Sequence, residues 1–470
     1  MIRSIHQPCV WLGAAAALVI GGITHADGPT LVRMSAPLTD SAFGQSLAAR
    51  STAGGCDVLV AAPSANGARG IVELFSLKGG QSTRTATLQP SDLLANEKFG
   101  FAVAISDTTI AAGSPFGTGA RGKVRVFARS TSGVGPAVVI ESPDAALNDA
   151  FGHAVATLGD WLAVGEPLDD SAGSALDRGA VHLFRQGTDG SWSVHARIVA
   201  PDAVAGDTFG YTLAMDASTL VIASRYADVG ALQQAGAVWT VALGQDGSVG
   251  PTVRVQAPDP GAYEWFGASV AIEGNTLVVG ACRDTISAEA SEQGTVRVFD
   301  RDGSGWIQST MLVSPGAATQ DRFGNSVAVN AGRILVGADG QDPQGVSLAG
   351  MMHLFRLGAA WTHDRAFELP NPGVNQNLGI ACAMTGSLVL GGAPRHTPTG
   401  GLLREGAVGV WSLAQPCAAD LDGNGAVSGA DLGLLLTLWN SVGSADLNGD
   451  GIVDAADLGA LLAAWGPCGP

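Results

Sequence analysis

Two twelve-residue stretches near the end of the chain carry oxygen-bearing side chains at matching positions. They are DLDGNGAVSGAD (420–431) and DLNGDGIVDAAD (446–457). Calcium prefers six or more oxygen ligands, and a twelve-residue loop can supply them from positions 1, 3, 5, 7, 9 and 12 around a glycine at position 6. The two stretches therefore predict two bound calcium ions. The alternative is a pair of Asx-rich turns that hold no metal.

The spacing assigns a ligand set to each loop. In the first loop Gly425 is the pivot, and the expected ligands are Asp420, Asp422, Asn424, the Ala426 carbonyl, Ser428 (directly or through water) and Asp431. In the second loop Gly451 is the pivot, and the expected ligands are Asp446, Asn448, Asp450, the Ile452 carbonyl, Asp454 and Asp457. Because metal binding and folding are coupled in such small modules, we expect this part of the chain to be largely unfolded without calcium.

Each loop is followed by one short apolar segment, LGLLLTLW (432–439) and LGALLAAW (458–465), which we expect to form helices buried against something. A duplicated loop-helix pair with Asp instead of Glu at position 12 resembles a dockerin module, over about residues 417–468. The resemblance implies a protein partner, cohesin-like or part of the cell envelope. Positions 10 and 11 are Gly429-Ala430 and Ala455-Ala456 instead of a Ser/Thr pair, so a cellulosomal partner is not implied. The apolar surface left over could face a partner or the side of the preceding domain.

Five cysteines remain if the first residues are removed. Cys417 and Cys468 flank the terminal module, and an exported protein meets an oxidising environment, so we expect these two to form a disulfide. The other three, Cys56, Cys282 and Cys382, have the character of buried small hydrophobic residues.

The N-terminal residues 1–26 have the pattern of a secretory signal peptide. Arg3 supplies the positive charge, residues 10–22 are apolar, and small residues at Thr24 and Ala26 precede the expected cleavage site. The alternative is a membrane anchor, but about 13 apolar residues are fewer than the ~20 that span a bilayer. We therefore expect a secreted, periplasmic or cell-surface protein with no membrane span in the mature chain.

The chain is acidic, with 25 Lys and Arg against 42 Asp and Glu and a formal net charge of −17. Such a chain repels phosphate backbones and anionic lipids, so nucleic acid is excluded as a partner. Hard cations such as calcium suit this charge.

The middle of the chain repeats one unit seven times. A Phe-Gly pair begins six copies and Leu-Gly the last, at intervals of 52 to 58 residues: Phe43, Phe99, Phe151, Phe209, Phe266, Phe323 and Leu378. Each copy contains four short β-branched runs separated by Gly and Pro, which predicts four strands. A repeated four-stranded antiparallel sheet is a propeller blade. The sequence therefore predicts a mainly β fold with a seven-bladed β-propeller over residues 27–415 and a small α-helical module over 416–470.

The two ends of the array predict how the ring closes. The seventh copy has only three strands, the last at 407–413, while an unassigned strand-like segment at 30–37 precedes the first copy. The N-terminal strand would complete the last blade and leave no open edge. An open solenoid is the alternative, and it would leave both segments unexplained.

A Gly-Ala-Pro-like turn follows each Phe-Gly pair, for example at 61–63, 113–115, 165–167 and 392–394. The pairing resembles the FG-GAP repeat family, which includes the propeller of integrin α subunits, and the resemblance covers residues 30–413. In those relatives calcium occupies an Asp-rich hairpin after the Phe-Gly strand. Here the equivalent hairpins, such as LGDW at 158–161, lack three carboxylates, so we expect a propeller without bound metal.

No nucleophile elbow, zinc-binding helix or phosphate loop is present in the sequence. His182 and His353 occupy a third-strand position that other copies fill with unrelated residues, which indicates a solvent-facing site; His153, after a Phe-Gly pair, is interpreted in the same way. Asp169 and Asp170 lie in a long loop where a ligand site would be least surprising. Acids precede the Phe-Gly strands and are expected to cap turns, or alternatively to line a cation site: Asp40, Asp149, Asp207, Glu264 and Asp321.

The leading hypothesis is a secreted, non-enzymatic interaction or adhesion protein. Its propeller would be a recognition platform for a protein or carbohydrate ligand, and the calcium-folded module would be its attachment point. The alternative is a propeller enzyme, a polysaccharide hydrolase or lyase, tethered by the same module. A third hypothesis makes the propeller a stiff spacer. Clustering of His182, Asp169 and Asp170 with the pre-Phe-Gly acids in a central pocket would favour the enzyme, and scatter would favour binding.

Overall fold

Seven four-stranded antiparallel sheets form most of the chain in the computed structural model. The structure describes residues 29–34, 36, 38–52, 55–78, 81–170, 176–287, 291–303, 305–386, 388–398, 401–413, 419–421, 426–441, 445–448 and 451–467. The chain divides into two compact units, of which the larger ends at Trp411 and the smaller includes Ser412–Pro470.

The seven sheets are the blades of a propeller, numbered here in chain order. Blade 1 contains β2 (Ser46–Thr52), β3 (Gly55–Ala62), β4 (Ile71–Lys78) and β5 (Gln81–Leu88). Blade 2 contains β6 (Val103–Ile105), β7 (Thr109–Ser114), β8 (Lys123–Ser130) and β9 (Gly133–Ile140). Blade 3 contains β10 (Ala154–Leu158), β11 (Trp161–Glu166), β12 (Ala180–Gln186) and β13 (Trp192–Ile198). Blade 4 contains β14 (Thr212–Met215), β15 (Thr219–Ser224), β16 (Ala237–Leu243) and β17 (Val249–Val255).

The remaining blades follow the same order, except at the end of the ring. Blade 5 contains β18 (Phe266–Glu273), β19 (Thr276–Ala281), β20 (Thr295–Asp302) and β21 (Gly305–Leu312). Blade 6 contains β22 (Ser326–Asn330), β23 (Arg333–Ala338), β24 (Met351–Leu357) and β25 (Trp361–Phe367). Blade 7 contains β26 (Cys382–Met384), β27 (Leu388–Ala393), β28 (Ala407–Ser412) and, from the other end of the propeller, β1 (Thr30–Val32). Single helical turns lie between second and third strands: α1 (Ala65–Ala68), α2 (Gly117–Ala120) and η1 (Pro343–Gly345).

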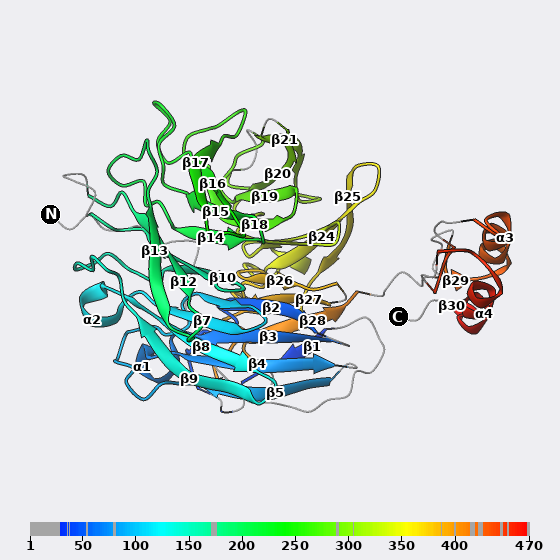
Figure 1. Ribbon diagram of the computed structural model, residues 1–470, viewed down its shortest axis with the longest axis horizontal. Coiled ribbons are helices and arrows are strands. Elements are labelled where there is room, and N and C mark those ends of the chain that lie inside the picture. The colour runs from blue at the N-terminus through cyan, green and yellow to red at the C-terminus, as the bar shows by residue number, and fades with distance from the viewer. Residues whose placement is uncertain are drawn as a thin grey trace. The chain divides into compact units, whose positions relative to one another are not determined.

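The ring closes by the predicted strand exchange. β1 pairs antiparallel with β28, with Leu31 opposite Gly409, so the two strands lie side by side (Figure 1). The first strand of each blade contacts the first strand of the next, and β26 of blade 7 contacts β2 of blade 1. The predictions of seven blades and of closure by the N-terminal strand are therefore confirmed.

Glycines set the distance between neighbouring blades. The first glycine of the Gly-Ala-Pro-like turn in one blade lies against the carbonyl oxygen of the next blade's Phe-Gly glycine, and a Cβ added at Gly113 would overlap the oxygen of Gly152. The same contact joins Gly392 of blade 7 to Gly44 of blade 1. Gly44 itself has φ +90, a conformation that glycine adopts without strain. In every blade but the fifth, the Phe-Gly pair lies before the first strand and not within it.

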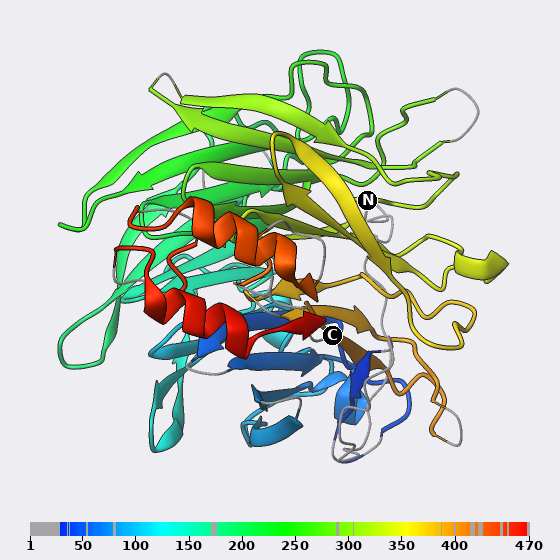
Figure 2. The same cartoon turned by 90° about the vertical axis from the view of Figure 1, so that its right-hand side faces the viewer.

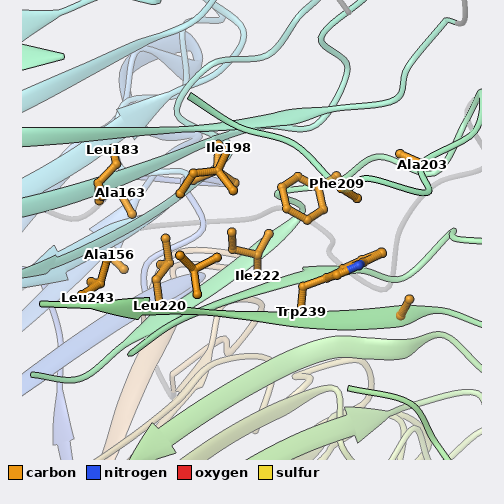
Figure 3. Close-up of a cluster of buried hydrophobic side chains, with 14 of the residues drawn as sticks. Ala156, Ala163, Leu183, Ile198, Ala203, Phe209, Leu220, Ile222, Trp239 and Leu243 are labelled. Carbon is orange, nitrogen blue, oxygen red and sulfur yellow. The ribbon is translucent and has the colours of Figure 1, made fainter. Parts of the chain in front are cut away.

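The Phe-Gly phenylalanine anchors the core of blades 1 to 6. Its ring packs edge-on against an aromatic ring of the third strand, for example Phe151 against Phe184 with ring centroids 6.1 Å apart. In blade 4 the partner is Trp239, at 5.1 Å from Phe209, and Figure 3 shows this pair with Leu220 and Ile222 in the core that blades 3 and 4 share. Such pairs contribute about 0.5–1.5 kcal/mol each beyond the burial of their area.

The two faces of the ring differ in their loops. Because the strands alternate in direction, the second-to-third-strand loops (such as 167–179) and the blade-to-blade connections (such as 199–211) share one face, called here the loop face. Short turns (such as 159–160 and 187–191) occupy the opposite, hairpin face.

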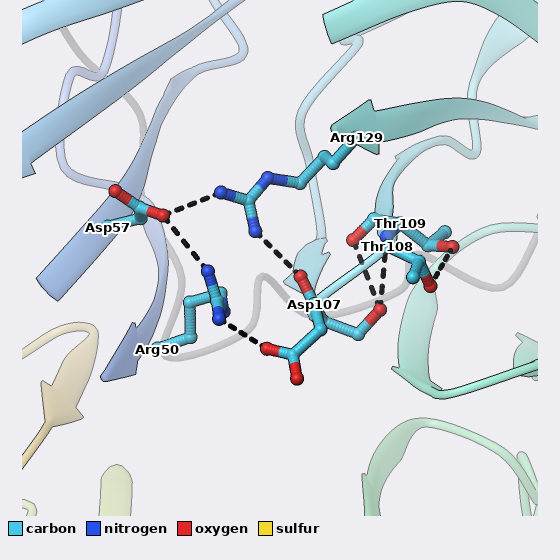
Figure 4. Close-up of polar contacts among 7 residues, drawn as sticks. Arg50, Asp57, Asp107, Thr108, Thr109 and Arg129 are labelled. Carbon is cyan, nitrogen blue, oxygen red and sulfur yellow. Dashed lines mark hydrogen bonds and ion pairs between the residues drawn. The ribbon is translucent and has the colours of Figure 1, made fainter. Parts of the chain in front are cut away.

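Ion pairs join neighbouring blades at the hairpin face. Figure 4 shows Asp57 of blade 1 between Arg50 of its own blade, at 3.1 Å, and Arg129 of blade 2, at 2.6 Å. Arg50 also pairs with Asp107 of blade 2. These side chains fix the register of two blades at the end of the sheets opposite the glycine contacts.

The smaller unit contains helices α3 (Gly429–Thr437) and α4 (Ala455–Ala463), which pack against each other (Figure 2). The two-residue strands β29 (Ala426–Val427) and β30 (Gly466–Pro467) pair antiparallel. Its core consists of three pairs of residues that are 26 positions apart, in keeping with the duplication: Ala419 and Ala445, Val427 and Val453, Leu435 and Leu461. None of the described helices has the length and apolar character needed to cross a bilayer.

Replacing a contact glycine should destabilise the propeller. Gly113 does not have a positive φ, so Gly113→Ala tests the inter-blade contact alone. Because the new methyl group must displace the next blade's backbone, we expect the free energy of unfolding to fall by about 1–3 kcal/mol, measured by urea denaturation. Gly303→Ala is the control, since nothing lies within 4 Å of its added Cβ. Equal stability of the two variants would contradict the role of the glycine contact.

Candidate functional site

A continuous row of aromatic side chains crosses blades 2 to 5 on the loop face. Phe101, His153 and Tyr211 each follow a Phe-Gly pair, and the ring centroids are 5.0 Å apart for the first two and 4.3 Å for the last two. The row extends through ring contacts at both ends. We call it the aromatic strip, and it comprises Phe116, Phe101, His153, Tyr211, Tyr226 and Trp265.

Cations hold the aromatic strip in place. Arg225 is 2% exposed, and its guanidinium carbon lies 3.9 Å from the ring centroid of Tyr211 and 4.7 Å from that of Trp265. It also donates a hydrogen bond of 2.9 Å to the Tyr226 hydroxyl. Burial, together with the nearby charge of Arg225, lowers the pKa of His153 to about 4. The aromatic strip is therefore a rigid surface whose histidine is neutral at physiological pH.

Exposed apolar side chains lie on the same face of the ring as the aromatic strip. Leu147, Leu176 and Val374 are 62%, 66% and 64% exposed, and all three lie in loops of the loop face. Other exposed apolar residues of this face lie in loops within blades and in the connections between blades. The full set is Leu94, Phe116, Leu147, Leu176, Val204, Tyr263, Ile286, Val374, Leu402 and Leu403. Exposed apolar residues also lie on outer strands such as β9 and β21, but the loop face has the aromatic strip as well, which makes it the candidate functional site.

The acids before the Phe-Gly pairs cap turns, as predicted, in most blades. Asp149 accepts a hydrogen bond from the backbone N–H of Ala146 at 2.7 Å, and Asp207 accepts one from Val204 at 2.8 Å. Asp321 accepts from Ala318 at 2.8 Å, and Glu264 accepts from the backbone of Gly261. Asp40 is different, because it is exposed and lies 3.6 Å from Arg404. These carboxylates are therefore spread around the ring, each in its own connection.

The third-strand position of His182 and His353 is buried, so the prediction of a solvent-facing site was wrong. His182 is 1% and His353 2% exposed. Each ring packs on the Phe-Gly phenylalanine of its own blade, at 5.8 Å from Phe151 and 5.7 Å from Phe323. Neighbouring blades cover both faces of every sheet. Residues on either face of a central strand are therefore buried between blades. His153 is half-buried as well, against Phe101 and Tyr211.

A polar cluster surrounds His182 in blade 3. Glu166 and Asp144 contact the histidine, and Asp169 pairs with Arg197, which also pairs with Asp144 at 3.2 Å. Asp170 instead accepts a hydrogen bond of 2.6 Å from the backbone N–H of Asp177. His182 and Asp169 do lie in one cluster, but both are 2% exposed or less and are closed to a polysaccharide chain.

The described parts of the two terminal loops have matching geometry. Asp431 accepts from the backbone N–H of Leu421 at 2.7 Å and from Ser428 at 2.8 Å. Asp457 accepts from Leu447 at 2.7 Å and from Asp454 at 2.8 Å. Backbone hydrogen bonds, first of all that from Asp454, hold the pKa of Asp457 below its usual value. The twelfth-position carboxylate thus folds each loop back on its first turn.

The first-position acid of the second loop points inward. Asp446 accepts a hydrogen bond of 2.9 Å from the N–H of Gly451, which has φ +98, as the predicted pivot requires. The loops therefore offer oxygen donors of the kind that a hard cation takes. Asp420, Asn448, Asp454, Ser428 and the carbonyls of Ala426 and Ile452 lie in the described part of these loops. Asp422, Asn424, Asp450, Cys417, Cys468 and residues 1–26 lie outside the described residues.

The predicted buried cysteines are confirmed in two cases. Cys56 and Cys282 are 0% exposed, while Cys382 is partly exposed. Burial raises the pKa of Cys56 to about 11 and that of Cys382 to about 12. Neither of these two thiols is a nucleophile at neutral pH.

Sequence reasoning missed the aromatic strip. A signal was available in the composition, because the chain has only three tyrosines, Tyr211, Tyr226 and Tyr263, and all three lie on the loop face. The position after the Phe-Gly pair varies from copy to copy, and that variation concealed the contact of its aromatic members in space.

Comparison with protein families agrees with this geometry. A model of the FG-GAP repeat matches residues 83–127, 137–184, 192–241, 251–299 and 306–355, just over half of the chain. The chain therefore belongs to the FG-GAP repeat family. Each match begins at or near the last strand of one blade and ends in the third strand of the next, so it spans the inter-blade contact. No curated protein matches the chain.

Acid should destabilise the propeller partly through His353. Its pKa is lowered to about 4 by burial, and its Nε2 lies 2.7 Å from Oε1 of Gln341. The unfolded chain therefore binds a proton below about pH 6.5 that the folded chain does not bind until about pH 4, so stability falls as pH falls through this window. His353→Gln should reduce that loss by an amount on the order of 3 kcal/mol, measured by urea denaturation at pH 7 and pH 4. A His353 ring that protonates near pH 6.5 in an NMR titration would contradict this.

Proposed function

We propose that this chain is a secreted, non-enzymatic interaction protein whose loop face binds a protein partner. The ring of exposed apolar side chains on that face carries the proposal. Monomeric soluble proteins rarely expose contiguous apolar surface, and an apolar surface rimmed by polar residues is typical of a binding site. Membership of the FG-GAP repeat family supports a recognition platform.

The aromatic strip supplies the rigid anchors that such an interface needs. Interface energy concentrates in a few aromatic and arginine residues that are held in place before binding. Tyr211 and Tyr226, which are both partly exposed, are fixed by their stacking on Arg225, and the buried Trp265 packs on the same guanidinium. Because these side chains are already ordered, a partner would lose little conformational entropy in ordering them.

The C-terminal unit is proposed to be a dockerin-like module that folds around two calcium ions and attaches the propeller to a second protein. The two tandem loops with oxygen ligands at every expected position support this. The folded-back carboxylates of Asp431 and Asp457 also support it, because they bring the ends of each loop together. A bound ion would neutralise the clustered carboxylates, and the carbonyls of Ala426 and Ile452 would complete its shell.

The helices of this unit keep apolar surface for a partner. Leu436 of α3 and Leu462 of α4 are 53% and 52% exposed, and Trp465, just after α4, is 50% exposed. These side chains support docking to a protein of the cell envelope or to a cohesin-like receptor. The signal-peptide pattern of residues 1–26 supports export.

Calcium removal should unfold the terminal helices and spare the propeller. We expect EGTA to abolish the helical circular dichroism of α3 and α4 and to leave the β signal unchanged, because the propeller core is independent of these loops. Added calcium should restore the helices. A spectrum that is the same with and without EGTA would contradict the proposal.

Binding should depend on the apolar side chains of the loop face. A Leu147→Ser, Leu176→Ser double variant should weaken partner binding by about tenfold or more, because each loses an exposed apolar contact. The matched control is Val253→Ser, Ile307→Ser, which alters side chains 52% and 53% exposed on the outer strands β17 and β21. Pull-down from the secreted fraction of the source organism, with and without calcium, compares the two variants. Equal capture by both would show that the loop face is not the binding surface.

A further inference from the structure

Blade 3 departs from the repeat at Glu166. This residue follows the glycine of the Gly-Ala-Pro-like turn and ends β11, and its side chain is completely buried. The other six blades have a small residue at this position: Ala62, Ser114, Ser224, Ala281, Ala338 and Ala393. A carboxylate that replaces alanine or serine in a closed core loses its hydration and requires a partner.

Two further ligand-type side chains meet Glu166. Oε2 of Glu166 lies 2.7 Å from Nε2 of His182, and Oδ1 of Asp144 lies 3.5 Å from the same nitrogen. The hydroxyl of Ser142 lies between the two carboxylates, 2.8 Å from Glu166 and 3.0 Å from Asp144, and can donate its one proton to either. One ligand atom from each of Asp144, Glu166 and His182 lies within 4.8 Å of the others.

The protein does not supply hydrogen-bond partners for all the buried polar atoms of this cluster. Nδ1 of His182 and Oε1 of Glu166 are buried without a hydrogen-bond partner, and the two carboxylates are the only groups described beside Nε2, at 2.7 and 3.5 Å. Leaving a buried polar atom unpaired costs about 1–3 kcal/mol. His182 is 1% exposed, so bulk water does not satisfy it.

A metal ion would take Nε2 of His182 and one oxygen of each carboxylate as its ligands. Zn²⁺ takes imidazole nitrogen and carboxylate oxygen at roughly 2.0–2.2 Å in a tetrahedron, which places ligand atoms about 3.4 Å apart. The observed separations of 2.7 and 3.5 Å lie on either side of that value. Two carboxylates would balance the charge of a divalent ion, and three protein ligands would leave a fourth position for water.

We propose that Asp144, Glu166 and His182 form a site for a divalent transition-metal ion, with the donor set of Zn²⁺. Arg197 pairs with Oδ2 of Asp144 and with Asp169, which turns Oδ1 of Asp144 toward the histidine. The site joins the blade 2 to blade 3 connection, which carries Asp144, to two strands of blade 3. It therefore pins that connection to the blade. The site lies on the loop face, away from the hairpins, and it revises the expectation of a metal-free propeller.

The competing explanation is an ion pair between a protonated His182 and Glu166. Blade 6 offers a natural comparison, because His353 occupies the same strand position and Ala338 stands where blade 3 has Glu166. Its Nε2 lies 2.7 Å from Oε1 of Gln341 and its Nδ1 lies 3.1 Å from His363. His353 therefore has the partners that His182 lacks, and it is the matched control.

Zinc binding to the full chain tests the proposal. Equilibrium dialysis against Zn²⁺ in excess calcium, which fills the terminal loops, should show one more zinc ion per chain in the wild type than in Glu166→Ala. That substitution introduces the residue that four other blades carry, so we expect it to fold, and circular dichroism checks this. His353→Gln should retain the full zinc stoichiometry. Ser142→Ala should weaken zinc binding by roughly 10-fold or more, because it removes the hydroxyl that lies between the two carboxylates.

Co²⁺ in place of Zn²⁺ gives an independent readout. The wild type and His353→Gln should develop the visible absorption of four-coordinate cobalt, and Glu166→Ala and His182→Gln should not. Equal zinc stoichiometry in the wild type and Glu166→Ala would overturn the proposal. A wild type that binds no zinc would also overturn it, and would leave the His182–Glu166 ion pair as the explanation.

Discussion

The contact between a glycine of one blade and the carbonyl oxygen of the next blade's Phe-Gly glycine is the constraint on which the propeller depends. Gly113 against Gly152 and Gly392 against Gly44 are two instances, the second between the last blade and the first. At these contacts neither glycine has room for a side chain, so the distance between the two blades is set by backbone atoms. Ala61 and Ala223 replace the first glycine in two blades, and there the Phe-Gly glycine that follows, Gly100 or Gly267, lies against the alanine methyl. A ring of seven closes because this spacing is nearly constant.

This constraint fixes each blade where its Phe-Gly pair and its Gly-Ala-Pro-like turn lie. The sequences of the loops on the loop face remain free to vary. The Phe-Gly phenylalanine must be buried next to the glycine contact, and the third-strand residue that packs on it must be buried too. That residue varies among the blades. Where it is an arginine it has its own acidic partners: Arg125 pairs with Glu97 and Asp92, and Arg297 pairs with Asp259 and Asp284. Similar backbones therefore enclose different polar clusters. In an isolated sheet, a position whose residue type varies from copy to copy would be expected to face solvent. In this propeller the varying third-strand position is buried, and each polar residue there has a local partner.

The sequence was sufficient for the architecture because the repeat is periodic and its ends are complementary. Seven copies, four runs per copy and the unassigned segment at Thr30 predicted the blade number and the pairing of β1 with β28. The sequence was not sufficient for the sites on the loop face. His153 and Tyr211 are 58 residues apart, and their contact follows from ring closure, not from any local pattern. Period-2 alternation also could not place His182, because both faces of a blade are covered by its neighbours. Glu166 was visible as an exception among alanines and serines, but its partner Asp144 belongs to another connection.

The two proposed kinds of ion site differ in the chemistry that selects their ions. The terminal loops offer oxygen donors, on backbone that we propose folds as the ion binds, and calcium tolerates such variable geometry. The blade 3 cluster adds an imidazole to two carboxylates on strands that the glycine contacts hold rigid. Imidazole favours zinc, and affinity for such a mixed site rises along the transition series and far exceeds that for calcium. A rigid site is also pre-formed, so little binding energy is lost in ordering its ligands. Calcium could then control the attachment module while the propeller, stabilised by its own backbone spacing, remains folded in either state.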